Sequence, residues 1–134
     1  MIKEITQEII SRTGWVLGTR VHFGTRPQDA ADRCALVAFN GGGAAEFDLP
    51  DRRDVMVQIL TRSGDYQQAY DDAVAAYVAL HGLAGVKLAV LVSGEAWEAL
   101  VIEAVAAPQY IGEDAKRRHE WSTNYIWKVK DASK

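Results

Sequence analysis

Hydrophobic residues recur at helical spacing in two parts of the chain, and each part predicts a helix. The first is the N-terminal segment, where apolar positions separated by polar ones form a stripe that should end near Gly14. Its apolar residues are Ile2, Ile5, Ile9 and Ile10. The second helix is predicted from Tyr66 to His81, with Asp65 as N-cap, Gln68 as its capping-box partner and Gly82 as the C-terminal stop. One face of this helix should carry Tyr66, Tyr70, Ala73, Tyr77 and Leu80.

Alternation with a period of two residues predicts strands in much of the remaining chain. In residues 54–62 both faces are partly apolar, so this strand should lie at the centre of a sheet. In residues 119–129 the alternation is clean, which predicts a half-buried antiparallel strand with Trp121, Tyr125 and Trp127 pointing inward. Shorter apolar runs predict further strands at residues 20–23, 34–39 and 86–92.

Residues 97–107 are open to two interpretations. Alternation favours a strand, whereas frequent alanine and glutamate favour a helix. As a strand, one face would carry Trp97, Ala99, Val101, Glu103 and Val105. Between the predicted elements, residues 40–53 should form a long surface loop and residues 110–115 a turn or loop.

The order of these elements predicts an α+β fold. We expect a mostly antiparallel sheet of four to six strands with two main helices packed on it, in the order α-β-β-β-α-β-β-β. The 134 residues contain no repeat and no linker, so residues 1–134 should form a single domain.

Composition and charge narrow the classes of function. Hydrophobic residues make up 49% of the chain and charged residues 25%, which is the balance of a globular domain and argues against wholesale disorder. Fifteen Lys and Arg against eighteen Asp and Glu give a net charge of −3, so a general basic footprint for nucleic acid is lacking. No apolar run approaches the ~20 residues needed to span a bilayer, and we expect no membrane partner.

A search for reactive groups predicts no catalytic, cofactor-binding or metal-binding residues. The three histidines are scattered, and the single Cys34 opens an apolar strand, which predicts a buried, inert thiol. Gly41–Gly43 lacks the lysine of a phosphate-binding loop, and the acidic pair Asp71-Asp72 is predicted to be a solvated face. We therefore expect no enzyme and no cofactor.

One basic cluster, Lys116–Arg118, leaves alternatives open. It could contact nucleic acid or an acidic partner, or it could be a solvated turn. A small nucleic-acid-binding module using this cluster is the alternative to a structural assembly protein. A small enzyme or ligand-binding domain is the third class.

Several stretches, taken together and in order, resemble the minor capsid or tail terminator proteins of long-tailed bacteriophages, also called tail completion or head–tail joining proteins. The resemblance covers nearly the whole chain. It is carried by residues 21–24, 57–62, 65–71, 80–83, 108–114 and 117–125.

The resemblance implies a structural virion protein at the neck, assembled in the host cytoplasm. It implies a hexameric ring on the head-proximal end of the tail tube, which stops tube growth and joins the tail to the head connector. The expected partners are copies of the chain itself, the tail tube protein and the neck protein. DNA should pass through the lumen without specific binding, because an acidic lumen repels phosphate.

A closed ring needs a head-to-tail interface between subunits, and we expect long loops and exposed aromatic residues to form it. The predicted loop 40–53 offers an apolar anchor among charges, and the segment after Pro108 offers a tyrosine with charged neighbours. The interface residues predicted on this basis are Phe47, Asp48, Leu49, Asp51, Tyr110, Asp114, Arg117 and Arg118.

Overall fold

The structure, a computed structural model, describes residues 2–18, 20–42, 52–91 and 93–132. Within these residues it contains two helices, α1 (Ile2–Thr13) and α2 (Tyr66–Leu80). The strands are β1 (Val21–Phe23), β2 (Cys34–Gly42), β3 (Arg52–Ser63), β4 (Ala84–Lys87), β5 (Trp97–Ala104), β6 (Gln109–Glu113) and β7 (His119–Asp131).

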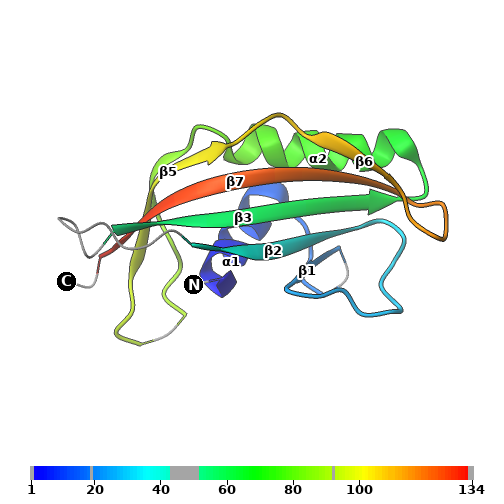
Figure 1. Cartoon of the computed structure of the whole chain (residues 1–134). Helices are drawn as coiled ribbons and strands as arrows, with labels where there is room; N and C mark the ends of the chain where they lie inside the picture. Colours follow the sequence, from blue (N-terminus) through cyan, green and yellow to red (C-terminus); the bar gives the residue numbers. More distant parts are fainter. Residues whose placement is uncertain (1, 19, 43–51, 92, 133–134) are drawn as a thin grey trace.

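All the strands belong to one sheet, in the order β1-β2-β3-β7-β5-β4, and β6 pairs with β7 beside β5. The pairing of β1 with β2 is parallel, whereas the other pairings are antiparallel. Figure 1 shows β3 and β7 running side by side through the middle of the sheet. The predicted α+β class and the order of its elements are confirmed.

In the described residues the sheet has seven strands, one more than the largest number predicted. Residues 109–113, predicted mainly as a turn, form β6 instead. The chain leaves β5, continues along the same edge of β7 and pairs with its first residues. A bulge between Tyr110 and Gly112 interrupts this pairing, and Gly112 has a φ of +117° that an L side chain rarely adopts.

The hydrophobic core lies between the helices and one face of the sheet. Alternate residues of β3 and β7 point into it, and the predicted inward positions Trp121, Tyr125 and Trp127 are all buried. Helix α2 packs on β3, β5 and β7, and α1 packs on α2 and β1. The largest side chains that are fully buried there are Trp127, Tyr125, Ile5, Ile9 and Ile59. The predicted central position of β3 is confirmed, because it lies between β2 and β7.

Helix α2 starts as predicted, but its cap uses a different partner. Asp65 Oδ1 accepts hydrogen bonds from the backbone amides of Gln67 and Gln68 at 2.9 and 3.2 Å. Gln68 does not return to the Asp65 amide, as a capping box would require. Instead Ser63 Oγ accepts from the Asp65 amide and donates to the Gln68 side chain at 2.7 Å. The last residue of β3 therefore fixes the start of α2.

The face of α2 that packs on the sheet is rich in alanine. Its buried residues are Ala69, Asp72, Ala73, Ala76 and Leu80, so it shares only Ala73 and Leu80 with the tyrosine-bearing face described from the sequence. Small alanine side chains let the helix approach the sheet closely, and the bulkier tyrosines lie at its border. Tyr66 and Tyr70 keep 48% and 38% of their surfaces exposed.

Asp72 corrects the prediction that the acidic pair is solvated, because only 6% of its surface is exposed. Arg33 donates to both of its carboxylate oxygens, from Nε at 3.0 Å and from Nη2 at 2.9 Å. Arg20 donates a third hydrogen bond at 3.3 Å. The bonds from Arg33 to Asp72 are the main cause of a raised pKa for the Arg33 guanidinium. Together the three bonds tie α2 to the segments that precede β1 and β2.

Residues 97–104 form a strand, which decides between the two interpretations, but the expected alternation is broken. A bulge lies between Ala99 and Val101 in the pairing with β7. Beyond it the faces exchange, so that Ile102 is buried and Glu103 is exposed. The strand predicted at residues 86–92 is shorter and lies earlier, at residues 84–87.

We predict that Trp127→Ala lowers the free energy of unfolding by about 3–5 kcal/mol, since the side chain is fully buried and its removal leaves a cavity. Trp127→Phe should cost less, because it keeps much of the volume and removes an indole N–H that has no partner in the described part of the chain. Urea denaturation measures both. Val78→Ala, at an exposed position of α2, is the control and should change stability by less than about 0.5 kcal/mol. Equal stability of Trp127→Ala and the parent would contradict the core described above.

We predict that Asp72→Asn destabilises the protein by about 1–2 kcal/mol, because charge-assisted hydrogen bonds from Arg33 and Arg20 are lost. The figure is at the low end because both arginines are partly exposed. The neighbouring Asp71→Asn is the matched control, since Asp71 is exposed and contacts only the Gln67 side chain by hydrogen bond within α2. Similar losses for both variants would mean that the buried ion pairs add nothing.

Candidate functional site

The predicted interface residues fall into two groups in the structure. Tyr110, Asp114, Arg117 and Arg118 all belong to the hairpin between β6 and β7. The predicted loop is shortened at both ends, because β2 extends to Gly42 and β3 begins at Arg52. The other four predicted residues, Phe47, Asp48, Leu49 and Asp51, lie outside the described residues.

Asp114 holds the β6–β7 hairpin in shape. Its Oδ1 accepts hydrogen bonds from the backbone amides of Lys116 and Arg118, each at 2.9 Å. Its Oδ2 accepts from Arg118 Nε at 2.7 Å. The bond from the Arg118 amide is the largest cause of a lowered pKa for the Asp114 carboxyl. The carboxylate therefore acts inside its own hairpin.

The two arginines of the hairpin differ in their surroundings. Arg118 is bound by its own chain, through Asp114 and through Asp32 at 3.3 Å, so its charge is already matched. Arg117 is exposed and has a φ of 59°, the left-handed conformation that L residues rarely adopt. The sequence alone could not show which of the two arginines the chain itself would bind.

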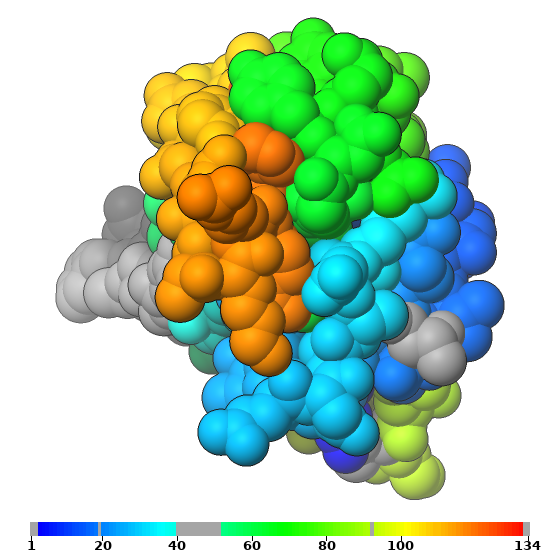
Figure 2. Space-filling model, turned by 90° about the vertical axis from the view of Figure 1, so that its right-hand side faces the viewer, coloured from blue at the N-terminus to red at the C-terminus, as the bar shows by residue number. Residues whose placement is uncertain are grey.

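The basic cluster Lys116–Arg118 borders a hollow of about 650 Å³ at this end of the molecule. Its lining includes Arg26, Arg62 and Arg118. Figure 2 shows the hairpin in orange between α2, in green, and the light blue and cyan segment before β2. Arg26 is paired with Glu120 at 3.1 Å, and Arg62 donates to backbone carbonyls of residues 30–32. Most of the positive charge here is thus engaged internally, which disfavours a phosphate site.

A cluster of aromatic rings lies next to this hairpin, where α2 begins. We call Tyr66, Tyr70 and Tyr110 the tyrosine patch; each is between 38% and 48% exposed. Their rings surround Trp121, with centroid distances of 5.5, 4.8 and 5.4 Å respectively. The prediction named Tyr110 alone. The signal that could have revealed the patch is the i, i+4 spacing of Tyr66 and Tyr70 just after the turn that follows β3.

Tyr110 is positioned by its own hydrogen bond. Its hydroxyl lies 2.9 Å from His119 Nδ1, and Glu113 Oε1 lies 3.8 Å from the same nitrogen. Partial burial among the rings, and then the negative charge of Glu113, raise the pKa of the Tyr110 phenol. The phenol therefore stays protonated beside His119 Nδ1. The patch combines exposed ring faces with an exposed carboxylate, which is a surface suited to a cationic side chain.

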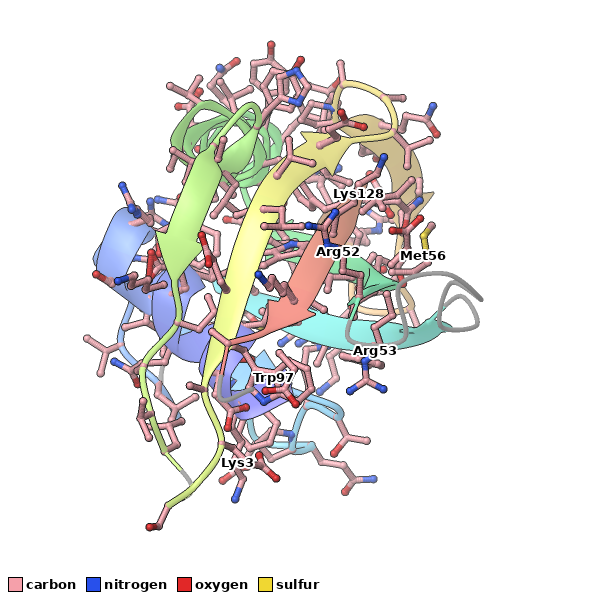
Figure 3. The ribbon with its side chains drawn as sticks, turned by 90° about the vertical axis from the view of Figure 1, so that its left-hand side faces the viewer. Lys3, Arg52, Arg53, Met56, Trp97 and Lys128 are labelled. Atoms are coloured by element: carbon pink, nitrogen blue, oxygen red, sulfur yellow. The ribbon has the colours of Figure 1, made fainter. Side chains whose placement is uncertain are left out.

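The opposite end of the sheet carries cations on the face that no helix covers. We call Arg52, Lys128 and Lys130 the basic strip. Arg52 is directly opposite Lys130 in the pairing of β3 with β7, and Lys128 follows two residues away on the same face. Figure 3 shows Arg52 and Lys128 at this end of the sheet. Asp54 and Glu98 are opposite Lys128 and Lys130, respectively.

On the other side of the same end, the Arg53 guanidinium lies 5.1 Å from the centroid of the Trp97 ring, as Figure 3 also shows. This cation–π contact joins the first residues of β3 and β5 across β7. The Arg53 guanidinium thus has a partner within its own subunit.

Within the described residues, no group of three or more His, Cys, Asp or Glu side chains is arranged to hold a metal ion. Cys34 is buried and not in a disulfide, as predicted. Neither described helix has the length and apolar character needed to cross a membrane.

Comparison with known proteins identifies the family. A family model described as the bacteriophage tail terminator protein matches residues 8–131. The chain belongs to the bacteriophage tail terminator family. The match includes α2, all the strands from β1 to β7 and the second half of α1, and it confirms the resemblance found in the sequence.

A solved structure shares the fold of this tail terminator. It is a chain from the virion of the native gene transfer agent (GTA) particle, with a TM-score of 0.60 and 15% sequence identity. The likeness covers 97% of this chain and 94% of that chain. At this identity the likeness shows a common fold. No curated protein matches the chain. The family supports a structural role in the phage tail and a place in the virion.

We predict that the Asp114 carboxyl titrates below its ordinary value of 3.8. A lowered folded-state pKa means that its stabilising bonds are present above the unfolded pKa and are lost as the pH falls through the folded pKa. The chemical shift of the carboxyl carbon, followed by NMR, measures the titration. The amides of Lys116 and Arg118 should lose protection from hydrogen exchange over the same acid range. Asp114→Asn, which keeps an oxygen acceptor, should abolish the titration, and a midpoint at or above 3.8 in the parent would contradict this account.

Proposed function

We propose that this tail terminator forms a ring of six subunits on the head-proximal end of the tail tube. The ring stops growth of the tube and presents a surface to the head connector. The observation that carries the proposal is the family match over residues 8–131. The fold shared with a virion chain over almost the whole of both chains supports it.

The protein acts by binding, without a catalytic step. Its partners are copies of itself, the tail tube protein and the neck protein, and the particle is assembled in the host cytoplasm. DNA passes through the lumen without specific binding, since a net charge of −3 per subunit favours repulsion of phosphate.

The residues predicted from the sequence enter this proposal in two roles. Phe47, Asp48, Leu49 and Asp51, with Tyr110 and Arg117, contact neighbouring proteins. Asp114 and Arg118 keep the β6–β7 hairpin in the shape that such contacts need, because they are bound to each other at 2.7 Å.

The same bond disfavours the alternative of a nucleic-acid-binding module built on Lys116–Arg118. A fluorescent DNA duplex at low salt tests it directly. Retention of the duplex that is lost on Lys116→Glu would support that alternative.

We expect the purified protein to stop the assembly of tail tubes in vitro. Tube protein polymerised alone should give tubes of growing and variable length. Addition of the terminator should arrest them, with a ring visible at one tip by negative-stain microscopy. Sedimentation of the protein with and without tubes establishes where the ring forms. Tubes that lengthen at the same rate with the protein present would refute the proposal.

A further inference from the structure

The basic strip carries positive charge that forms no salt bridge with the described residues of its own subunit. In the described part of the chain, Arg52, Lys128 and Lys130 each lack a carboxylate within salt-bridge distance. Arg52 and Lys130 are directly opposite each other, and like charges in that arrangement destabilise a sheet. In addition, the buried Arg52 Nε has no hydrogen-bond partner there. An acceptor from outside the subunit would remove both penalties.

The tyrosine patch offers the complementary chemistry. Its three rings present partly exposed faces, and Glu113, whose side chain is 48% exposed, lies beside Tyr110. Arginine stacks on aromatic faces and lysine pairs with carboxylates, so the patch and the strip can satisfy each other. Ile111, also exposed, adds an apolar contact next to the rings.

The two surfaces cannot meet within one subunit. The basic strip is at the start of β3, and the tyrosine patch is beside the end of β3, where α2 begins. Strand β3 has 12 residues, which at about 3.3 Å per residue extend over roughly 40 Å. Complementary surfaces at opposite ends of a rigid sheet are what a head-to-tail interface between copies requires.

We propose that the tyrosine patch of one subunit packs on the basic strip of the next copy of the same chain. Arg52 places its guanidinium against the tyrosine rings, and Glu113 pairs with Lys128. The proposal rests on the ring proposed above and identifies the surfaces that close it. Asp54 and Glu98 are opposite two cations of the basic strip, so the strip lacks the continuous positive charge that a phosphate backbone needs. The tyrosine patch brings one carboxylate beside uncharged rings, which needs less positive charge from the strip.

Two charge reversals test the interface, Glu113→Lys and Lys128→Glu. Both positions are exposed, so both variants should fold. Each variant alone brings like charges together at every contact, and it should sediment as a monomer under conditions where the parent forms rings. An equimolar mixture should regain rings with alternating subunits. In such a ring the new lysine meets the new glutamate at one contact, and the native pair is kept at the next.

Three further measurements make the outcome decisive. Melting curves followed by circular dichroism should coincide with that of the parent for both variants. Lys3→Glu, at an exposed lysine of α1 on the helix-covered side of the sheet, should assemble like the parent. The parent itself, with tail tubes added if needed, establishes whether rings form at all.

Rings from either variant alone, or no rings from the mixture, would overturn the proposed interface while leaving the ring itself intact. A parent that forms no ring, with or without tubes, would instead refute the proposed assembly. Binding of a DNA duplex that Lys128→Glu abolishes would assign the strip to nucleic acid and overturn the proposal.

Discussion

The pairing of β3 with β7 is the constraint on which the rest of the structure depends. The two strands pair residue for residue from Arg52 and Lys130 to Ser63 and His119. Because the side chains of a strand alternate, this one register sends a continuous row from both strands into the core. A slip of one residue would move the whole row, including Trp127, to the uncovered face. The same register places the basic residues at one end and the start of α2 at the other.

The two ends of this sheet differ in whether their charged side chains form ion pairs within the chain. Near the β6–β7 hairpin, carboxylates and arginines are matched within the chain, as in the pairs of Arg33 with Asp72 and of Arg118 with Asp114. These contacts hold loops and α2 in place. At the opposite end, Arg52 and the lysines of β7 have no such matches in the described residues. Unmatched charge has a cost in the isolated subunit, and an assembly of copies can remove it.

Membership of the tail terminator family accords with a molecule whose distinctive groups are suited to contact rather than to chemistry. The exposed rings of Tyr66, Tyr70 and Tyr110 all contact Trp121, and those of Tyr66 and Tyr110 also contact His119. Aromatic side chains held in this way lose little conformational entropy when a partner packs on them. The hairpin that carries Tyr110 is itself held in shape by Asp114, so the tyrosine patch is preorganised for binding.

The sequence by itself determined the two helices, the central strands and the inward positions of β7, because apolar periodicity records which face of an element is buried. It also determined the family, through motifs distributed along nearly the whole chain. The tertiary structure decided what depends on contacts between distant segments. It decided that Asp72 is buried against Arg33 and Arg20, that Arg118 is held by Asp114 and Asp32, and that residues 109–113 form a strand. A charge in a sequence has no partner until the fold supplies one, and local pattern cannot show which face of an alanine-rich helix meets the sheet.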